Sequence, residues 1–423
     1  AGLANVPCCA PGPRLGFAPT STSNVTLTSV GGMTLAHNVT GPTGVTLTDT
    51  GASAVLEHSG GNISTTNANI SLVADNMWLH SGSNTITAGT GNITVRPNNT
   101  SGTIRLGPTP YNTAAGSLDL DSSELNAFGT ANTLIIGGAS HSGAIQTSGS
   151  AAFSNPAGNI LVATNGNINV QASSSLSYTG TSGNLTLSAT SGSISGGGSL
   201  TATNVRLLAA NGIGSTAAPV HVAGTATNLT ANNTASGQVV VRASSGDLNL
   251  VSSLSNTGTG GVELSAADGS INSGTVAVSS GGALSMIANA TGTTARTLTV
   301  GTGGLSASGA VTLLSADDLS INGNVSSGGG AVTLVAGNAS GMTLVSKATE
   351  PSDTDGGVSI NAKIVAGAGN ISIYATESVL QPNNNTSLAG LQTTGTLTVR
   401  TYNDTPQGAK IDRVDIDQIA YDG

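Results

Sequence analysis

A five-residue phrase returns along the whole chain: a glycine, a small or polar residue, an aliphatic residue, a polar residue and a second aliphatic residue. Residues 91–95 (Gly-Asn-Ile-Thr-Val) are one copy, and further copies begin at Gly166, Gly183, Gly246, Gly309, Gly330, Gly369 and Gly395. Because side chains alternate along a strand with period two, each copy predicts a turn followed by a short strand with one apolar face. Such a strand cannot bury that face alone, so the many copies predict strands that stack on one another.

The spacing of the copies indicates the kind of stack. Val311 and Val332 hold equivalent places in successive copies, and so do Leu185 and Val205. A unit of about 20 residues with two or three short strands is typical of one coil of a parallel β-helix. We therefore predict an all-β fold, a parallel β-helix (β-solenoid) with about 20 residues per coil.

Three segments differ in composition. Residues 1–22 are rich in proline and read as a leader or N-terminal cap, and 23–403 form the β-solenoid repeat domain. Residues 404–423 are a charged C-terminal cap or docking segment, in which charged and aliphatic residues alternate. Its aspartates, Asp412, Asp415 and Asp417, belong to a solvated last coil, to a Ca²⁺ site or to a contact with another subunit, and the spacing does not decide among these.

Composition excludes several classes of protein. The chain has 423 residues, of which 60 are glycine, with 7% charged and 2% aromatic residues. Glycine has no three-residue period, which excludes collagen, and no apolar run approaches the ~20 residues of a membrane helix. A core of Val, Leu, Ile and Ala without large aromatic residues indicates a narrow core repeated many times.

The charge is low and scattered. The formal net charge is −9, with 11 lysine and arginine residues spread along the chain. A nucleic-acid partner needs a basic stripe to neutralise phosphates, so we expect no nucleic acid partner and no membrane insertion.

The two cysteines are neighbours, Cys8 and Cys9, in a proline-rich stretch. Adjacent cysteines rarely bond to each other, because a disulfide needs Cα atoms ~4.4–6.8 Å apart in a suitable orientation. They are either unpaired or a possible contact that cross-links subunits.

One stretch resembles a known family. Residues 118–128 (Leu-Asp-Leu-Asp-Ser-Ser-Glu-Leu-Asn-Ala-Phe), 132–137 (Asn-Thr-Leu-Ile-Ile-Gly) and 142–145 (Ser-Gly-Ala-Ile) resemble a unit of the filamentous-haemagglutinin-like, two-partner-secreted bacterial exoproteins. The resemblance implies a right-handed parallel β-helix, an outer-membrane secretion partner, a secreted or cell-surface location, and adhesion to a host, cell or abiotic surface. The family's N-terminal secretion domain is not found, since residues 155–159 (Asn-Pro-Ala-Gly-Asn) only faintly resemble its signature.

Carboxylates and histidines give no catalytic or metal-binding pattern. Asp317 and Asp318 are the one adjacent acidic pair and read as a turn before a strand, because neighbouring strand residues point to opposite faces. Asp353 and Asp355 lie in a polar insertion, which is a solvated loop or a cation site. The five histidines never stand at ligand spacing. We predict no catalytic residue, no metal site and no cofactor.

The single tryptophan and the Asn-x-Ser/Thr triplets can each be interpreted in two ways. The single tryptophan, Trp78, packs under a loop or stacks on a sugar. Asn-x-Ser/Thr triplets recur inside the repeat phrase, where stacked asparagine or threonine ladders explain them without glycosylation.

These observations favour a non-enzymatic structural or adhesive protein, with possible self-association end to end into filaments. A polysaccharide-processing β-helix enzyme is the alternative. A third hypothesis is ice binding through Thr-x-Thr triplets such as those that begin at Thr26, Thr46 and Thr297.

Overall fold

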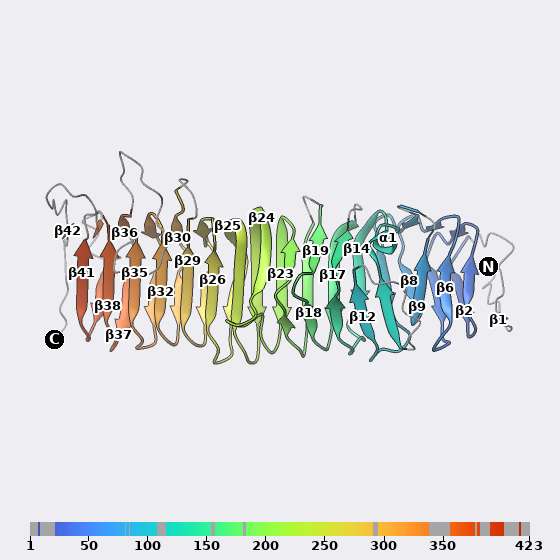
Figure 1. Cartoon of the computed structure of the whole chain (residues 1–423), viewed down its shortest axis with the longest axis horizontal. Coiled ribbons are helices and arrows are strands. Elements are labelled where there is room, and N and C mark those ends of the chain that lie inside the picture. The colour runs from blue at the N-terminus through green and yellow to red at the C-terminus, as the bar shows by residue number, and fades with distance from the viewer. Residues whose placement is uncertain are drawn as a thin grey trace. The chain divides into compact units, whose positions relative to one another are not determined.

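The computed structural model describes residues 7–8, 22–80, 82–83, 85–107, 116–153, 157–180, 183–290, 295–337, 356–376, 379–380, 390–401 and 414–415. Nearly all of these residues belong to parallel β-structure, which forms a β-solenoid of about 14 turns with about 24 residues per turn (Figure 1). The predicted fold class is confirmed. Some turns are longer than the expected 20 residues because they contain additional elements, as between β11 (Asn92–Arg96) and β14 (Ala131–Gly137), where two strands and a helical turn intervene.

Within each unit, most turns contribute three short strands, one to each of three parallel ladders, which we letter A, B and C in the order of the strands along a turn. Inward-facing aliphatic side chains stack from turn to turn, and Leu187 and Leu313 are both fully buried. The two spacings noted in the sequence are ladder registers, since Leu185 pairs with Val205 and Val311 pairs with Val332. The repeat phrase therefore predicted strands correctly, although the copies that begin at Gly166 and Gly246 belong to ladder B and the others to ladder A.

Contacts divide the chain into two compact units, Ala1–Ala210 and Asn211–Gly423. Unit 1 holds the following strands. Ladder A consists of β1 (Pro7–Cys8), β2 (Val25–Ser29), β5 (Val45–Asp49), β8 (Ile70–Val73), β11, β14, β17 (Ala157–Thr164), β20 (Leu185–Ala189) and β23 (Asn204–Ala209). Ladder B consists of β3 (Met33–Leu35), β6 (Val55–His58), β9 (Asn76–Leu79), β13 (Ser117–Leu120), β12 (Thr103–Leu106), β15 (Ile145–Thr147), β18 (Ile168–Val170) and β21 (Ile194–Ser195). Ladder C consists of β4 (Val39–Thr40), β7 (Ile63–Ser64), β10 (Ile86–Thr87), β16 (Ser150–Phe153), β19 (Ser175–Tyr178) and β22 (Ser199–Thr201).

In unit 2, two long strands follow more than one ladder, β24 (Val220–Asn233) and β25 (Val239–Asn256). The ladders of unit 2 are lettered by the order of their strands within a turn. Ladder A runs through β26 (Val262–Ala266), β29 (Leu284–Ala288), β32 (Val311–Ser315), β35 (Val332–Ala336), β38 (Ile371–Ala375) and β41 (Leu397–Thr401). Ladder B runs through β27 (Ile271–Asn272), β30 (Leu298–Val300), β33 (Leu319–Ile321), β36 (Val358–Ile360), β39 (Val379–Leu380) and β42 (Val414–Asp415). Ladder C runs through β28 (Val278–Ser280), β31 (Leu305–Ala307), β34 (Val325–Ser327), β37 (Ile364–Gly367) and β40 (Leu391–Thr393).

Asparagine and aspartate side chains link successive turns at the corners of both units. The side-chain Oδ1 of one turn accepts a hydrogen bond from a main-chain N–H of the next turn, as from Asn92 to Asn69 (2.9 Å) and from Ser270 to Asp247 (2.8 Å). The same contact is made by Asn38, Asn67, Asp75, Asn159, Asn167, Asp318, Asn324 and Asn370. The predicted asparagine ladders are present, and they satisfy N–H groups that the turns leave unpaired.

Ladder B of unit 1 contains the main irregularity. After β12 the chain turns back, so that β13 pairs with β12 on the side facing β9. β13 lies next to β9 but is not hydrogen-bonded to it as a ladder, so ladder B is broken between them. The helical turn α1 (Ser122–Leu125) follows β13 and packs against β9 and β16. It is the one helical element among the residues that the structure describes.

A glycine is required at one corner near this ladder. Gly61 has φ of 70°, and a Cβ at this position would lie 2.3 Å from the carbonyl carbon of His37 in the preceding turn. A side chain cannot fit there, because the backbones of two turns meet at the corner.

Both ends of the described chain carry short strands. β1 pairs with β2, with Pro7 opposite Thr28 and Cys8 opposite Ser29, and β42 pairs with β39. The side chains of Cys8 and Asp415 are not described, and Cys9, Asp412 and Asp417 lie outside the described residues. The subunit contacts expected at these positions remain predictions.

Candidate functional site

The outward face of ladder B in unit 1 carries side chains that differ from the rest of the repeat. We call this line of residues the Trp78 row. It contains Thr34, Glu57, Trp78, Asp119, Arg105, Gln146, Asn169 and Ser195, in their order along ladder B. In unit 2 the corresponding line of ladder B, lettered by its place within a turn, runs through uncharged amide and hydroxyl residues from β24 to β36 and ends at Leu380 and Asp415; the uncharged residues are Asn228, Asn249, Asn272, Thr299, Ser320 and Ser359.

Neighbouring side chains hold the members of the row. The Thr34 hydroxyl donates to Glu57 Oε2 (3.0 Å), and Gln171 Nε2 donates to Gln146 Oε1 (3.4 Å). The Trp78 ring meets the His80 ring edge-on, with centroids 5.6 Å apart and planes at 70°. These contacts restrict the side chains while Trp78 and Glu57 keep part of their surface exposed.

Arg105 and Asp119 form an ion pair within the row. Arg105 Nη1 lies 3.5 Å from Asp119 Oδ2, and the Asp119 side chain is only 7% exposed against 36% for Arg105. Asp119 Oδ1 is buried and accepts no hydrogen bond from the described residues. Burial raises the pKa of Asp119, and the adjacent Arg105 guanidinium opposes that rise.

Glu124 of α1 closes the break in ladder B. Its Oε1 accepts from the Leu79 N–H of β9 (3.3 Å), and its Oε2 accepts from the Asp121 N–H (2.9 Å). Asp121 Oδ1 in turn accepts from the Glu124 N–H (2.9 Å), which completes a capping box. The carboxylate thus takes the place of the carbonyl that a continuous ladder would offer to Leu79.

The environment of Glu124 changes its proton affinity. Burial raises the pKa of Glu124 to about 7, with a smaller contribution in the same direction from the charges of Asp121 and Asp119. The N–H groups of Asp121 and Leu79 oppose this rise by stabilising the carboxylate. Glu124 therefore titrates near neutral pH.

The geometry favours binding over chemistry at this place. Both oxygens of Glu124 already accept main-chain hydrogen bonds, Asp121 caps α1, and Asp119 faces Arg105. What remains towards solvent is a partly exposed aromatic ring with polar groups on either side. Such a surface suits a ligand with an apolar face and several hydroxyl groups.

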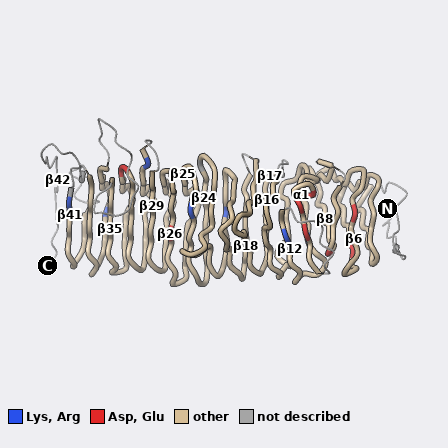
Figure 2. Tube along the Cα trace, viewed as in Figure 1, with Lys and Arg blue, Asp and Glu red and all other residues tan. Residues whose placement is uncertain are grey.

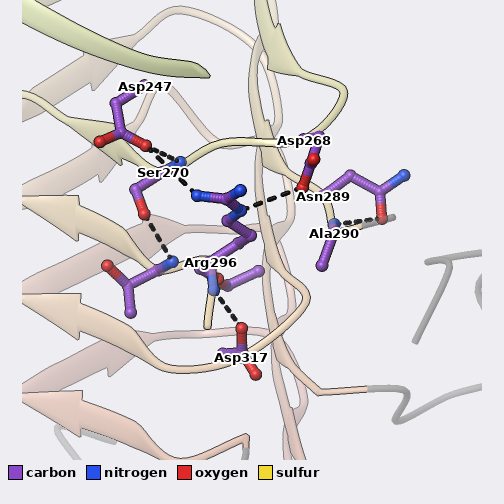
Figure 3. A network of polar contacts seen from close by, with 9 residues as sticks. Asp247, Asp268, Ser270, Asn289, Ala290, Arg296 and Asp317 are labelled. Atoms are coloured by element: carbon purple, nitrogen blue, oxygen red, sulfur yellow. Dashed lines mark hydrogen bonds and ion pairs between the residues drawn. The ribbon is translucent and has the colours of Figure 1, made fainter. Parts of the chain in front are cut away.

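The predicted turn at Asp317 and Asp318 is confirmed, since both follow β32 and precede β33. Asp317 Oδ2 accepts from the main-chain N–H of Arg296, whose guanidinium contacts Asp268 (3.0 Å) and Asp247 (3.9 Å). Figure 3 shows these groups converging on Arg296 from neighbouring turns. The pair belongs to a structural network.

The histidines of the described chain do not come together. His58 and His141 are fully buried in separate turns, and burial lowers the pKa of both. Within the described ranges, no group of three or more His, Cys, Asp or Glu side chains is placed to hold a metal ion. Asp353 and Asp355 lie outside those ranges. No helix in the described part of the chain is long and apolar enough to cross a bilayer.

Sequence reasoning did not identify Glu124 or the Arg105–Asp119 pair. The capping-box spacing of Asp121 and Glu124 is a signal that could have found α1. The pairing of Arg105 with Asp119 depends on the reversal of the chain after β12, which the repeat phrase does not encode.

Comparisons with protein families, curated proteins and solved structures found no match. The resemblance to filamentous-haemagglutinin-like exoproteins therefore stays a prediction.

Proposed function

We propose that this chain is a non-enzymatic structural and adhesive β-solenoid of an extracellular or cell-surface setting, able to associate with copies of itself. The observation that supports this proposal is the character of the outward rows. Several of them, outside the Trp78 row, carry short hydroxyl and amide side chains in register, such as Ser255, Ser279, Ser306 and Ser326 on ladder C of unit 2. Rows of this kind offer flat and extended contact surfaces.

Charge supports the same proposal. Most of the tube in Figure 2 is free of charged residues, and the charged positions are scattered. Repulsion between copies, or between the chain and a weakly charged surface, is therefore small.

Two measurements test the proposal. Latex beads coated with the purified chain should adhere to cells, and negative-stain images should show particles that associate at higher protein concentration. Beads coated with the heat-unfolded chain serve as the control. Beads that fail to adhere to a wide panel of cells and surfaces, together with particles that stay single at every concentration, contradict the proposal.

A polysaccharide-processing enzyme is the second candidate, and one observation favours it. Glu124, with its pKa raised to about 7, has the proton affinity of a general acid and lies in the same cluster as Asp119. Incubation with neutral and acidic polysaccharides would release new reducing or unsaturated ends if the chain cleaves them. Glu124→Gln would abolish that release.

The ice-binding hypothesis finds limited support. Thr26 and Thr28 of β2 pair in register with Thr46 and Thr48 of β5, but the next strand presents Ser71 and Val73. The two-column threonine grid at this place is only two turns deep.

A further inference from the structure

We propose that the Trp78 row binds a neutral saccharide, with one sugar ring stacked on Trp78 and its hydroxyl groups hydrogen-bonded to Glu57 and His80. The inference rests on the proposed adhesive function, because it names a class of ligand that such a protein would hold. It concerns one face of unit 1 and requires no other part of the chain.

The aromatic platform is the first support. Trp78 is the single tryptophan of the chain, and it stands at an outward position of a row whose other members are all polar. His80 is exposed on the same side of β9 and meets the indole edge-on, which limits the orientations of the ring. An ordered, partly exposed indole presents an apolar face to the C–H face of a sugar.

The polar groups beside the platform are the second support. Glu57 is directly paired with Trp78 across β6 and β9, one strand spacing of ~4.8 Å away. The hydrogen bond from Thr34 to Glu57 Oε2 fixes the orientation of the carboxylate. The other oxygen, Oε1, accepts no hydrogen bond from the described residues. A sugar ring on Trp78 therefore lies within hydrogen-bond reach of a fixed carboxylate.

Sheet geometry supplies the third support. On the other side of Trp78, ladder B is broken, and β13 approaches β9 without a continuous set of hydrogen bonds. Asp119, whose side chain is more than nine-tenths buried and whose Oδ1 accepts no hydrogen bond from the described residues, lies at this break. The break therefore places a buried carboxylate oxygen without a hydrogen bond beside the strand that carries Trp78.

The negative charge near Trp78 favours a neutral saccharide over an anionic one. Glu57 pairs with Trp78, Asp119 lies on β13 beside β9, and Asp121 and Glu124 belong to α1, which packs against β9. Arg105 is the one basic residue of the row. In Figure 2 the acidic positions of this part of unit 1 lie at β6 and around α1. An anionic polysaccharide would meet excess negative charge, so a neutral one is favoured.

The single tryptophan makes the test direct. The intact chain is titrated with the neutral hexaoses of cellulose, chitin, xylan, mannan and starch, and separately with heparin and polygalacturonate oligosaccharides, while tryptophan fluorescence is recorded. We expect at least one neutral hexaose to shift the emission of Trp78 in a saturable way. The anionic oligosaccharides should leave it unchanged at equal concentration.

Variants then locate the contact by calorimetry or affinity electrophoresis. Trp78→Ala should weaken binding by more than about tenfold, and Glu57→Gln by about tenfold, since a hydrogen bond to a charged group contributes about that much. Asn249→Ala, at the equivalent outward position of unit 2, is the matched control and should bind like the unchanged chain. Far-ultraviolet circular dichroism shows whether each variant keeps its β-structure.

Three outcomes overturn the proposal: no hexaose shifts the fluorescence, the anionic oligosaccharides bind more tightly than the neutral ones, or Trp78→Ala binds as well as the unchanged chain. If the fluorescence stays silent while coated beads still adhere, the saccharide site is wrong and the adhesive function stands. If a hexaose binds while the beads do not adhere, the saccharide site stands and the adhesive function is wrong.

Discussion

Unit 1 and unit 2 are built from the same three-strand turn but bury different polar groups. Unit 1 buries ionisable side chains at several turns, among them His58, Glu124 and His141. In unit 2 the interior polar stack is an amide pair, in which Asn233 Nδ2 donates to Asn256 Oδ1 (2.9 Å). A neutral amide can be satisfied by main-chain groups alone, whereas a buried charge depends on its partner and on pH. Unit 2 also buries one ionisable side chain, Asp317, which accepts a hydrogen bond from the Arg296 N–H. The comparison shows that a buried polar position of the repeat can be filled either by a group that titrates or by a neutral amide.

The largest expected difference between the units concerns their ion pairs. Arg105→Gln leaves the buried carboxylate of Asp119 without its cation, so we expect a loss of about 3 kcal/mol in the free energy of unfolding. Arg242→Gln in unit 2 removes the cation from a more exposed pair with Glu263 and should cost less than about 1 kcal/mol. Urea unfolding followed by circular dichroism measures both, and equal losses would contradict the contrast.

The second prediction concerns pH and Glu124. Its folded pKa of about 7 exceeds the ordinary value of 4.5, so the folded state binds more protons between these values. The contribution of Glu124 to the free energy of unfolding is therefore largest at and below pH 4.5. It decreases by up to about 3 kcal/mol as the pH rises towards 7.

Glu124→Gln keeps an oxygen acceptor and removes the titration. We expect the free energy of unfolding of this variant to lose most of that slope between pH 4.5 and 7. Glu263→Gln is the matched control in unit 2, because its carboxylate is partly exposed and paired with Arg242. A slope that survives Glu124→Gln would show that another group causes it.

A smaller effect is expected at the amide stack of unit 2. Asn256 Nδ2 donates to the carbonyls of Gly260 (2.8 Å) and Gly237 (3.0 Å), so Asn256→Ala should cost about 2 kcal/mol by leaving buried acceptors unsatisfied. Asn256→Ser should recover part of that loss, because Ser280 fills the next position of the stack and donates to the Ala283 carbonyl. Thermal unfolding at pH 5 and 8 should give the same cost, and a pH-dependent cost would contradict a neutral interior.

The smallest predicted effect appears in acid. Burial lowers the pKa of His141 below its ordinary 6.5, so the unfolded state binds more protons and stability is lost as pH falls below 6.5. His141→Leu removes this loss, and its acid-unfolding midpoint should move to lower pH. His221→Leu, at a half-exposed position of unit 2, should move the midpoint less.

Most of the fold could be predicted from the sequence, for a physical reason. Alternation of aliphatic and polar residues determines which side of a short strand is buried, so phrases such as the one around Val311 and Val332 define the ladder and its register. The asparagine ladder was predictable as well, because Asn69 and Asn92 occupy the same place in successive phrases.

The candidate site was predictable only in part. Trp78 stood out as the single tryptophan, but its neighbours could not be known from local pattern. Arg105 precedes Asp119 in the sequence, but along ladder B the order of their strands is reversed: β13, which carries Asp119, lies between β9 and β12. A reversal of this kind depends on tertiary packing. Glu124 is buried because α1 packs against β9 and β16. The pattern of apolar residues around α1 does not indicate this packing.

The corner contacts also have a consequence for the time order of folding. At Asn38, Asn69, Asn159 and Asn370 the acceptor oxygen belongs to the earlier turn and the donor N–H to the later one. A chain that emerges N-terminal end first thus has each oxygen in position before the matching N–H arrives. Every completed winding is then a template for its successor, and assembly can advance in one direction without waiting for distant residues.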